Sequence, residues 1–163
     1  MKRLSAAIRP RNLLLAFLGC LFGTMSVLGG ENDMERAVVI QYLGPQNKTV
    51  ALLAFAEGVG QVTVATISEL KMGDGAMETL IQEIAVTPQI MIRILDAVPA
   101  AKAPKQPLLR VGFVDRPNGK IGTVDVEEAG AIDFANAVGQ AISAEPDATI
   151  VFKTWLGRTS LVR

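Results

Sequence analysis

The chain has 163 residues, of which half are apolar and 20% are charged, and its formal net charge is zero. With a mean hydropathy of +0.35, this composition excludes a wholly disordered chain and fits one domain plus a short extra segment. Histidine is absent and Cys20 is the only cysteine. These counts exclude histidine-based acid–base catalysis, histidine-containing zinc sites and an intramolecular disulfide.

The amino terminus has the charge order of an exported protein. Four basic residues precede an uncharged stretch over 12–30, and acidic residues begin at Glu31. This order is typical of a segment that inserts with its amino end in the cytoplasm. The stretch has 19 residues, between the ~7–15 of a signal-peptide core and the ~20 of a membrane span. Residues 1–30 are therefore predicted to be a signal peptide, cleaved before Gly30, or a single-span membrane anchor.

Cys20 lies inside this apolar stretch. Phe17 stands where a lipoprotein signal has an aliphatic residue, and apolar residues follow the cysteine, so Cys20 is interpreted as part of the stretch. The remaining residues, 31–163, carry 12 basic and 16 acidic side chains, a net charge of −4. This charge gives no electrostatic reason to bind nucleic acid.

Strands are predicted in the first part of the 31–163 domain. Residues 37–43 are β-branched and apolar and end at Gly44-Pro45, residues 49–56 form a second apolar run, and residues 61–67 alternate. Turn residues separate the three runs, which predicts an antiparallel meander.

The middle of the domain is harder to interpret. Residues 74–86 have a helical period, with apolar residues at i, i+3, i+4 and i+7, and Pro88 ends this pattern. Residues 89–98 alternate, which predicts a strand. Three prolines in 98–107 indicate an extended surface connection.

The carboxyl-terminal part predicts a hairpin, a helix and a strand. Runs over 108–114 and 120–126 flank the turn 115–119, which contains Asn-Gly. Residues 129–144 have a helical period, and residues 149–156 are interpreted as a final strand. The predicted apolar face of the helix contains Ile132, Ala135, Val138, Ala141 and Ile142. These elements predict a mainly antiparallel β, sandwich-like domain with one or two short helices, or alternatively an α+β fold.

One sequence motif is typical of a serine nucleophile. Ser68 and Lys71 fit S-x-x-K, in which a lysine can activate serine in penicillin-recognising enzymes, and Lys153-Thr154-Trp155 weakly imitates a second motif of those enzymes. However, Ser68 follows a predicted strand rather than beginning a helix, and no S-D-N element is present. A serine at the end of a strand is the preferred interpretation.

Other candidate sites also have structural explanations. Gly58-x-Gly60 and Gly73-x-Gly75 do not complete a phosphate-binding glycine pattern and are interpreted as turns. Asn47-Lys48-Thr49 is a glycosylation sequon, relevant only to a secreted eukaryotic protein. A cluster of carboxylates has the chemistry to hold calcium but lacks EF-hand spacing, and contains Asp125, Glu127, Glu128 and Asp133. The aromatic residues predicted to lie in the core are Tyr42, Phe113, Phe152 and Trp155.

The carboxyl half contains an ordered series of segments over about residues 90–163. They are Ile92-Arg93-Ile94-Leu95-Asp96, Leu108 to Phe113, Arg116-Pro117-Asn118-Gly119-Lys120, Ile132 to Ile142, Ile150-Val151-Phe152 and Ser160-Leu161. In this order the segments resemble the exported invasion-associated locus B proteins of alphaproteobacteria. The two turn cysteines of the family are replaced by Arg116 and Lys120, so its disulfide cannot form. The resemblance implies a β-sandwich, in which 77–86 is a strand, and a periplasmic or surface protein linked to host-cell entry.

Together these observations predict a non-catalytic envelope protein that acts by macromolecular contact, with no cofactor, no metal and no catalytic residue. It is expected in the periplasm or on the outer face of the inner membrane. Its expected partner is another envelope or membrane protein, and it touches the membrane only through 12–30 if that segment is uncleaved. An accessory or assembly subunit of a membrane complex, anchored by 12–30, is the alternative. A small serine hydrolase using Ser68 and Lys71 is a remote one.

Overall fold

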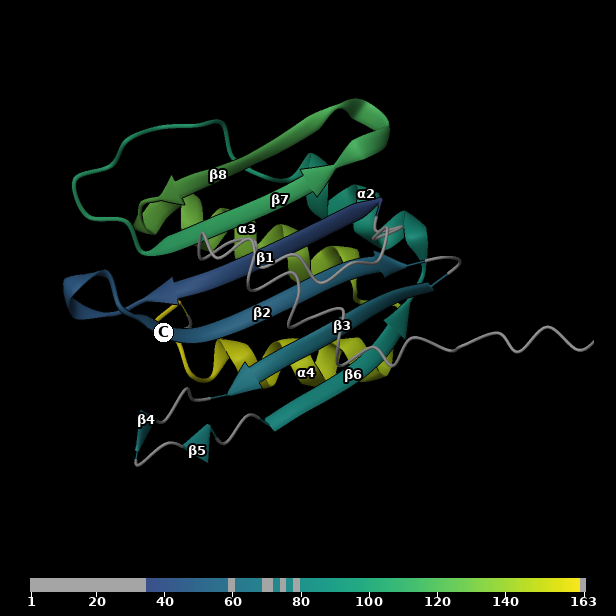
Figure 1. Cartoon of the computed structure of the whole chain (residues 1–163), viewed down its shortest axis with the longest axis horizontal. Helices are drawn as coiled ribbons and strands as arrows, with labels where there is room; N and C mark the ends of the chain where they lie inside the picture. Colours follow the sequence, from purple (N-terminus) through teal and green to yellow (C-terminus); the bar gives the residue numbers. More distant parts are fainter. Residues whose placement is uncertain (1–34, 59–60, 69–71, 74–75, 78–79, 162–163) are drawn as a thin grey trace, which may run out of the picture. The chain divides into compact units, whose positions relative to one another are not determined.

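The computed structural model describes residues 35–58, 61–68, 72–73, 76–77 and 80–161, with side chains at 35–55 and 87–161. All of them belong to the unit Asp33–Arg163, so the predicted leader 1–30 lies outside the described residues. An antiparallel sheet of six strands, in the order β6-β3-β2-β1-β7-β8, is covered by α2, α3 and α4 on one face (Figure 1).

The described elements follow one another as strands, then a helix, a hairpin and two helices. The sheet consists of β1 (Arg36–Leu43), β2 (Thr49–Gly58), β3 (Gln61–Ser68), β6 (Leu80–Val86), β7 (Leu109–Asp115) and β8 (Lys120–Val126). Two short strands pair apart from it, β4 (Met72–Gly73) and β5 (Ala76–Met77). The helices are α2 (Pro88–Asp96), α3 (Glu128–Ala141) and α4 (Pro146–Leu156), with 3-10 turns η1 (Pro45–Asn47) and η2 (Arg116–Asn118).

The predicted meander is confirmed. β1 pairs antiparallel with β2, and β2 pairs antiparallel with β3. Both central strands are apolar at consecutive positions, and residues 37–40 and 51–55 are buried throughout. Strands buried on both faces are expected to show such continuous apolar runs. The order of the strands places β1 and β2 at the centre of the sheet.

The predicted hairpin is also confirmed, because β7 and β8 pair in register around the turn at 116–119. Gly119 adopts the left-handed conformation (φ 65°), which glycine reaches without steric cost. The Asn118 side-chain amide donates a hydrogen bond of 2.7 Å to the Asp115 carboxylate. The conformational preferences of the turn residues therefore determine the pairing of β7 with β8.

The segment 74–86, whose helical period left helix and strand both open, contains a strand in its described part. Leu80–Val86 forms strand β6, which pairs antiparallel with β3 at the edge of the sheet. Pairing with β3 supplies the backbone hydrogen bonds that a helix would otherwise supply within the segment. The strand that the family resemblance implied within 77–86 agrees with β6.

The strand predicted over 89–98 is instead α2. Pro88 occupies the first helical turn, where its missing N–H costs nothing. Ile90, Met91 and Ile94 are buried against the sheet, whereas Ile92 is 42% exposed. Ile90 and Ile94 thus fit one face of a helix as well as one face of a strand, and packing against the sheet favours the helix.

The strand predicted over 149–156 is likewise a helix, α4, and it too begins with a proline in its first turn. The helix predicted over 129–144 is confirmed as α3, and of the predicted face Ala135, Val138, Ala141 and Ile142 are buried but Ile132 is not. Ile132 is 38% exposed, and Ala131 and Phe134 are buried in its place. The proline-rich connection 98–107 is confirmed as extended chain whose one bridge joins Lys102 to Asp125.

The main core lies between the sheet and the helices. Its largest fully buried side chain is Trp155 of α4, which stacks on Phe152 at 5.9 Å between ring centroids. Gly139 of α3 allows the Phe152 ring to approach, since a Cβ there would lie 3.1 Å from it. Among the described residues a layer of helices, rather than a second large sheet, covers this face. An antiparallel sheet with three helices on one face therefore fits both the mainly β expectation with short helices and the α+β alternative, and the sandwich-like arrangement is not confirmed.

Candidate functional site

The residues of the serine motif are not brought together into a described site. Ser68 ends strand β3, as expected, and Lys71 lies outside the described residues. Lys153 and Thr154 belong to helix α4, and the Thr154 hydroxyl donates to the Ile150 carbonyl oxygen at 2.9 Å. Of the glycine pairs, Gly58 ends β2 and Gly73 ends β4, while Gly60 and Gly75 lie outside the described residues.

The carboxylate cluster is dispersed over β8 and α3. Asp125 lies on β8, Glu127 precedes α3, and Glu128 and Asp133 are within that helix. Across the described part of the chain, no group of three or more Asp, Glu, His or Cys side chains is placed to hold a metal ion. Asp125 is instead paired with a cation, as shown below.

The aromatic residues are core residues, as predicted, although two of them lie on a helix rather than a strand. Phe152 and Trp155 are buried in α4, and Tyr42 and Phe113 pack partly buried against the same core. The Tyr42 hydroxyl lies 2.7 Å from the Ser160 hydroxyl, which ties the end of the described chain to β1. These rings stabilise the domain and do not form an exposed platform.

The sheet has a second face, opposite the helices. Because side chains alternate along a strand, the core residues Val38 and Ile40 of β1 place Ala37 and Val39 on this face. In the same way, Leu53 and Phe55 of β2 place Leu52 and Ala54 there. We call Ala37, Val39, Leu52 and Ala54 the apolar patch. The strand register pairs Val39 with Ala54, so the patch is continuous across β1 and β2.

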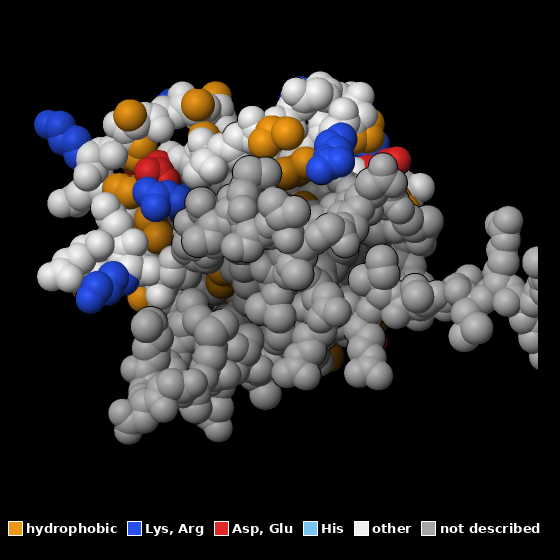
Figure 2. Space-filling view, viewed as in Figure 1, with side chains coloured by type: hydrophobic (Ala, Val, Ile, Leu, Met, Phe, Trp, Pro, Cys, Tyr) orange, Lys and Arg blue, Asp and Glu red, His pale blue; other side chains and the backbone are white. Residues whose placement is uncertain are grey.

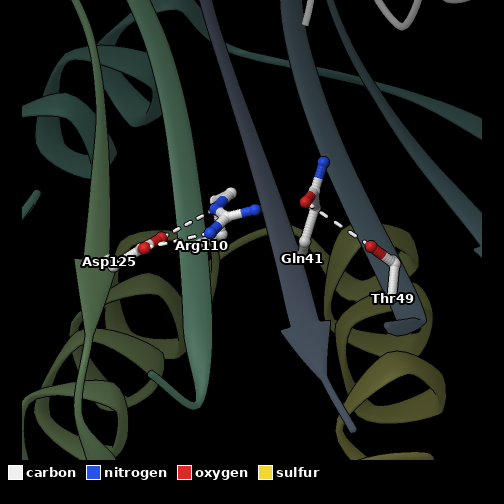
Figure 3. Close-up of polar contacts among 4 residues, drawn as sticks. All are labelled: Gln41, Thr49, Arg110 and Asp125. Carbon is white, nitrogen blue, oxygen red and sulfur yellow. Dashed lines mark hydrogen bonds and ion pairs between the residues drawn. The ribbon is translucent and has the colours of Figure 1, made fainter. Parts of the chain in front are cut away.

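A row of polar side chains crosses β8, β7, β1 and β2 on the second face (Figure 3). Arg110 is opposite Gln41 on one side and opposite Asp125 on the other. The Arg110 guanidinium donates two hydrogen bonds to the Asp125 carboxylate, of 2.7 and 3.0 Å. The Thr49 hydroxyl donates a long bond of 3.5 Å to the Gln41 side-chain oxygen. We call these four residues the polar row.

The two partners of the ion pair in the polar row shift each other's pKa. The hydrogen bond from Arg110 lowers the pKa of Asp125 below its ordinary value, and the bond to Asp125 raises the pKa of Arg110. Their side chains are 40% and 31% exposed, so water screens the pair. The pair therefore fixes side-chain orientation at the rim of the second face more than it stabilises the fold.

Strand β8 forms one edge of the sheet and carries an exposed apolar side chain. Ile121 is 74% exposed, while the other end of the strand is bridged by Lys102 to Asp125. Figure 2 views the molecule from the second face, where hydrophobic side chains lie between lysine and arginine side chains. An edge strand with exposed apolar groups is a common site of contact with another chain.

Turn η1 and the 105–108 segment border an open hollow of about 500 Å³. Its rim includes Gln46 and Asn47, which both have left-handed backbone conformations (φ 61° and 56°). Glycine and asparagine adopt such conformations most readily, and glutamine seldom does. The charged residues that line the hollow are Lys105 and Glu128, and this pair does not indicate a particular reaction or ligand.

Sequence reasoning missed the second face as a candidate site. The signal was present, because a half-buried strand shows strict alternation and residues 37–40 do not.

Among the described residues, no helix combines the length and hydropathy that crossing a bilayer requires. Comparison with family models, curated proteins and solved structures finds no match for this chain.

Proposed function

We propose that this chain is a non-catalytic exported envelope protein that acts by contact with another macromolecule through the second face of its sheet. The apolar patch is the observation that carries this proposal. A sheet face of apolar side chains must be buried against another element, and the described helices α2, α3 and α4 all lie on the opposite face (Figure 1).

The rim of the same face supports a contact role. The polar row orients a cation and a carboxylate beside the apolar patch, and Ile121 extends the apolar surface to the β8 edge. An apolar centre with an oriented polar rim is the usual anatomy of a protein interface. The basic, apolar and acidic order of residues 1–35 supports export, so the partner is an envelope or membrane protein.

Site-specific photo-crosslinking in the native cells tests this proposal. A photoreactive residue replaces Ile121 at the rim of the second face or, as a control, Ile150 on the outer side of α4, which is 56% exposed. We expect a discrete adduct with an envelope protein from position 121 and none from position 150. Equal labelling from both positions, or no adduct from position 121, contradicts the proposal.

The accessory-subunit alternative differs in the fate of residues 12–30, whose 19-residue length is close to that of a membrane span. The intact amino-terminal mass of the protein from its native membrane separates the two. A retained start favours the anchored subunit, and a start near Gly30 favours the processed envelope protein. Full-length, unprocessed protein dissolved in the cytosol contradicts both.

A further inference from the structure

The outer edge of strand β8 has backbone groups that the described sheet leaves unpaired. The Leu43 N–H donates to the Leu108 carbonyl oxygen at 2.9 Å, so the even-numbered positions leading into β7 direct their backbone groups toward β1. The odd-numbered residues of β7 therefore face β8, and the register places even-numbered residues of β8 opposite them. The odd-numbered residues of β8 are Ile121, Thr123 and Asp125, and their N–H and C=O groups point away from the sheet.

A described residue covers one of these positions. Lys102, in the proline-rich connection, bridges Asp125 on the outer side of β8. Among the described residues nothing pairs with the outer side of Ile121 or Thr123, because β8 is the last strand of the sheet. Both residues are exposed, and Ile121 is 74% exposed. We call residues 121–123 the open edge.

We propose that an extended segment of the partner polypeptide adds to the open edge as a further strand of the sheet. This inference rests on the proposed function, because it states how the partner of the second face is held. The backbone N–H and C=O groups of a sheet edge bind another strand through main-chain hydrogen bonds. The neighbouring side chains then select which segment binds.

Ile121 joins the open edge to the second face. The register places Ile121 opposite Val114 of β7, and Val114 opposite Ala37 of the apolar patch. Side chains opposite one another lie on the same face of a sheet. An added strand therefore lies beside Ile121 and extends the second face beyond β8, so we expect a β-branched or other apolar side chain on the segment at that position.

The charges around the open edge indicate an acidic segment. Lys120 precedes the open edge on β8, and Lys102 lies beyond its other end. Both lysines are exposed, and neither forms an ion pair with a described residue. The Asp125 carboxylate at this edge is already paired with Arg110. We therefore expect carboxylates at the ends of the segment, because complementary charges steer association and fix the register.

A second copy of this chain does not fit the open edge as a separate segment does. In the two-fold pairing that uses both outward residues, Ile121 lies opposite Thr123 of the second copy. The antiparallel register then places Gly119 of the copy opposite Asp125, which is the position that Lys102 occupies. Gly119 ends a hairpin turn, so this turn and Lys102 compete for the same place. An extended segment has no such turn and can end before Lys102.

A proline substitution tests the inference in the crosslinking assay at position 121. Thr123→Pro removes an outward N–H, and proline is tolerated on an edge strand where the N–H faces solvent. The adduct from position 121 should fall several-fold in this variant. Thr123→Val keeps the backbone N–H and should retain the adduct, because the main chain makes the contact. A Thr123→Pro chain that folds and keeps the adduct overturns the inference.

A charge reversal tests the same contact with the backbone intact. Lys120→Glu should lower the adduct yield several-fold, because it places a like charge beside the acidic segment. Lys153→Glu, on the exposed side of α4, is the matched control and should leave the yield unchanged. An undiminished yield from Lys120→Glu overturns the inference. An adduct with the mass of two copies of the chain assigns the open edge to a second copy and also overturns it.

Amide hydrogen exchange of the full chain tests whether the edge accepts a strand. In the protein alone, the amides of Ile121 and Thr123 should exchange faster than those of Gly122 and Val124, which face β7. The probe is a blocked peptide of alternating valine and threonine with a glutamate at each end. It should slow exchange at Ile121 and Thr123 several-fold, and the same peptide with N-methylated amides should not. Slow exchange before the peptide is added, or no slowing afterwards, overturns the inference.

The inference and the proposed function fail separately. Slowed exchange with the peptide, combined with no adduct from position 121 in cells, retains the strand-accepting edge and removes the envelope partner. An adduct from position 121 that persists in Thr123→Pro retains the partner and removes the strand addition.

Discussion

The two faces of the sheet are built from the same strands but with side chains of different size. The helix-covered face holds Ile40, Leu53 and Phe55 and packs against Trp155. The second face holds mainly alanine and valine on β1 and β2 and ends in a polar row. Because hydrophobic stabilisation grows with the apolar area buried, the helix-covered face carries most of the stability. The second face, with smaller side chains on β1 and β2, contributes less of this stabilisation.

Trp155→Ala should produce the largest effect, on the helix-covered face. The indole is 1% exposed, so its loss leaves a cavity between the sheet and α4 and should lower the free energy of unfolding by about 3–5 kcal/mol. Urea denaturation followed by circular dichroism measures this change. Trp155→Phe is the control, and it should cost less because the Trp155 indole N–H has no hydrogen-bond partner among the described residues. A loss below about 1 kcal/mol for Trp155→Ala contradicts the assignment of the core.

Adjacent leucines on β2 compare the faces directly. Leu53 is 0% exposed on the helix-covered face and Leu52 is 1% exposed on the second face. Leu53→Ala should lower the free energy of unfolding by about 2–5 kcal/mol. Leu52→Ala should cost less, near the lower end of this range, because none of the described helices packs on the second face and the truncated side chain leaves the helix-covered core intact. Equal losses of unfolding free energy for the two variants would show that the two faces contribute equally to stability.

The turn between β1 and β2 lies on neither face of the sheet. A substitution there therefore tests backbone strain without changing the packing of either face. Gln46 is left-handed, which costs an L residue about 1–2 kcal/mol, so Gln46→Gly should stabilise the protein by up to about 1 kcal/mol after the entropy of glycine is included. Thermal unfolding measures the shift. Lys48→Gly is the control and should destabilise, because Lys48 has an ordinary φ of −78°.

The smallest effect is expected in the polar row. Asp125→Asn removes the ion pair with Arg110 and should cost less than about 1 kcal/mol near neutral pH, because both side chains are partly exposed. The pKa of Asp125 is lowered in the folded protein, so this stability is present above the ordinary carboxyl pKa. It should disappear progressively below about pH 5 as the carboxylate is protonated. Denaturation of both chains across this range, with Asp133→Asn as control, should show the gap closing only for Asp125.

Local sequence determined the elements that depend on turns and simple periods. The meander of β1, β2 and β3 follows from apolar runs separated by turn residues, and the β7–β8 hairpin follows from the Asn-Gly turn. Helix α3 and most of its buried face follow from its period, although Ile132 of the predicted face is 38% exposed. These features are encoded within a few residues of where they occur.

Tertiary structure decided the segments that two periods fit equally well. Ile90 and Ile94 are compatible with a strand and with a helical face, and contact with the sheet selected the helix. The segment at Leu80–Val86 has a helical period but pairs with β3. Pro88 and Pro146 begin helices α2 and α4, where the sequence analysis expected Pro88 to end a helical pattern and expected a strand over 149–156. Proline in a first helical turn was therefore the local signal that went unused. The packing of α2 and α4 against the sheet depends on contacts between segments that are distant in the sequence, which no short window of sequence contains.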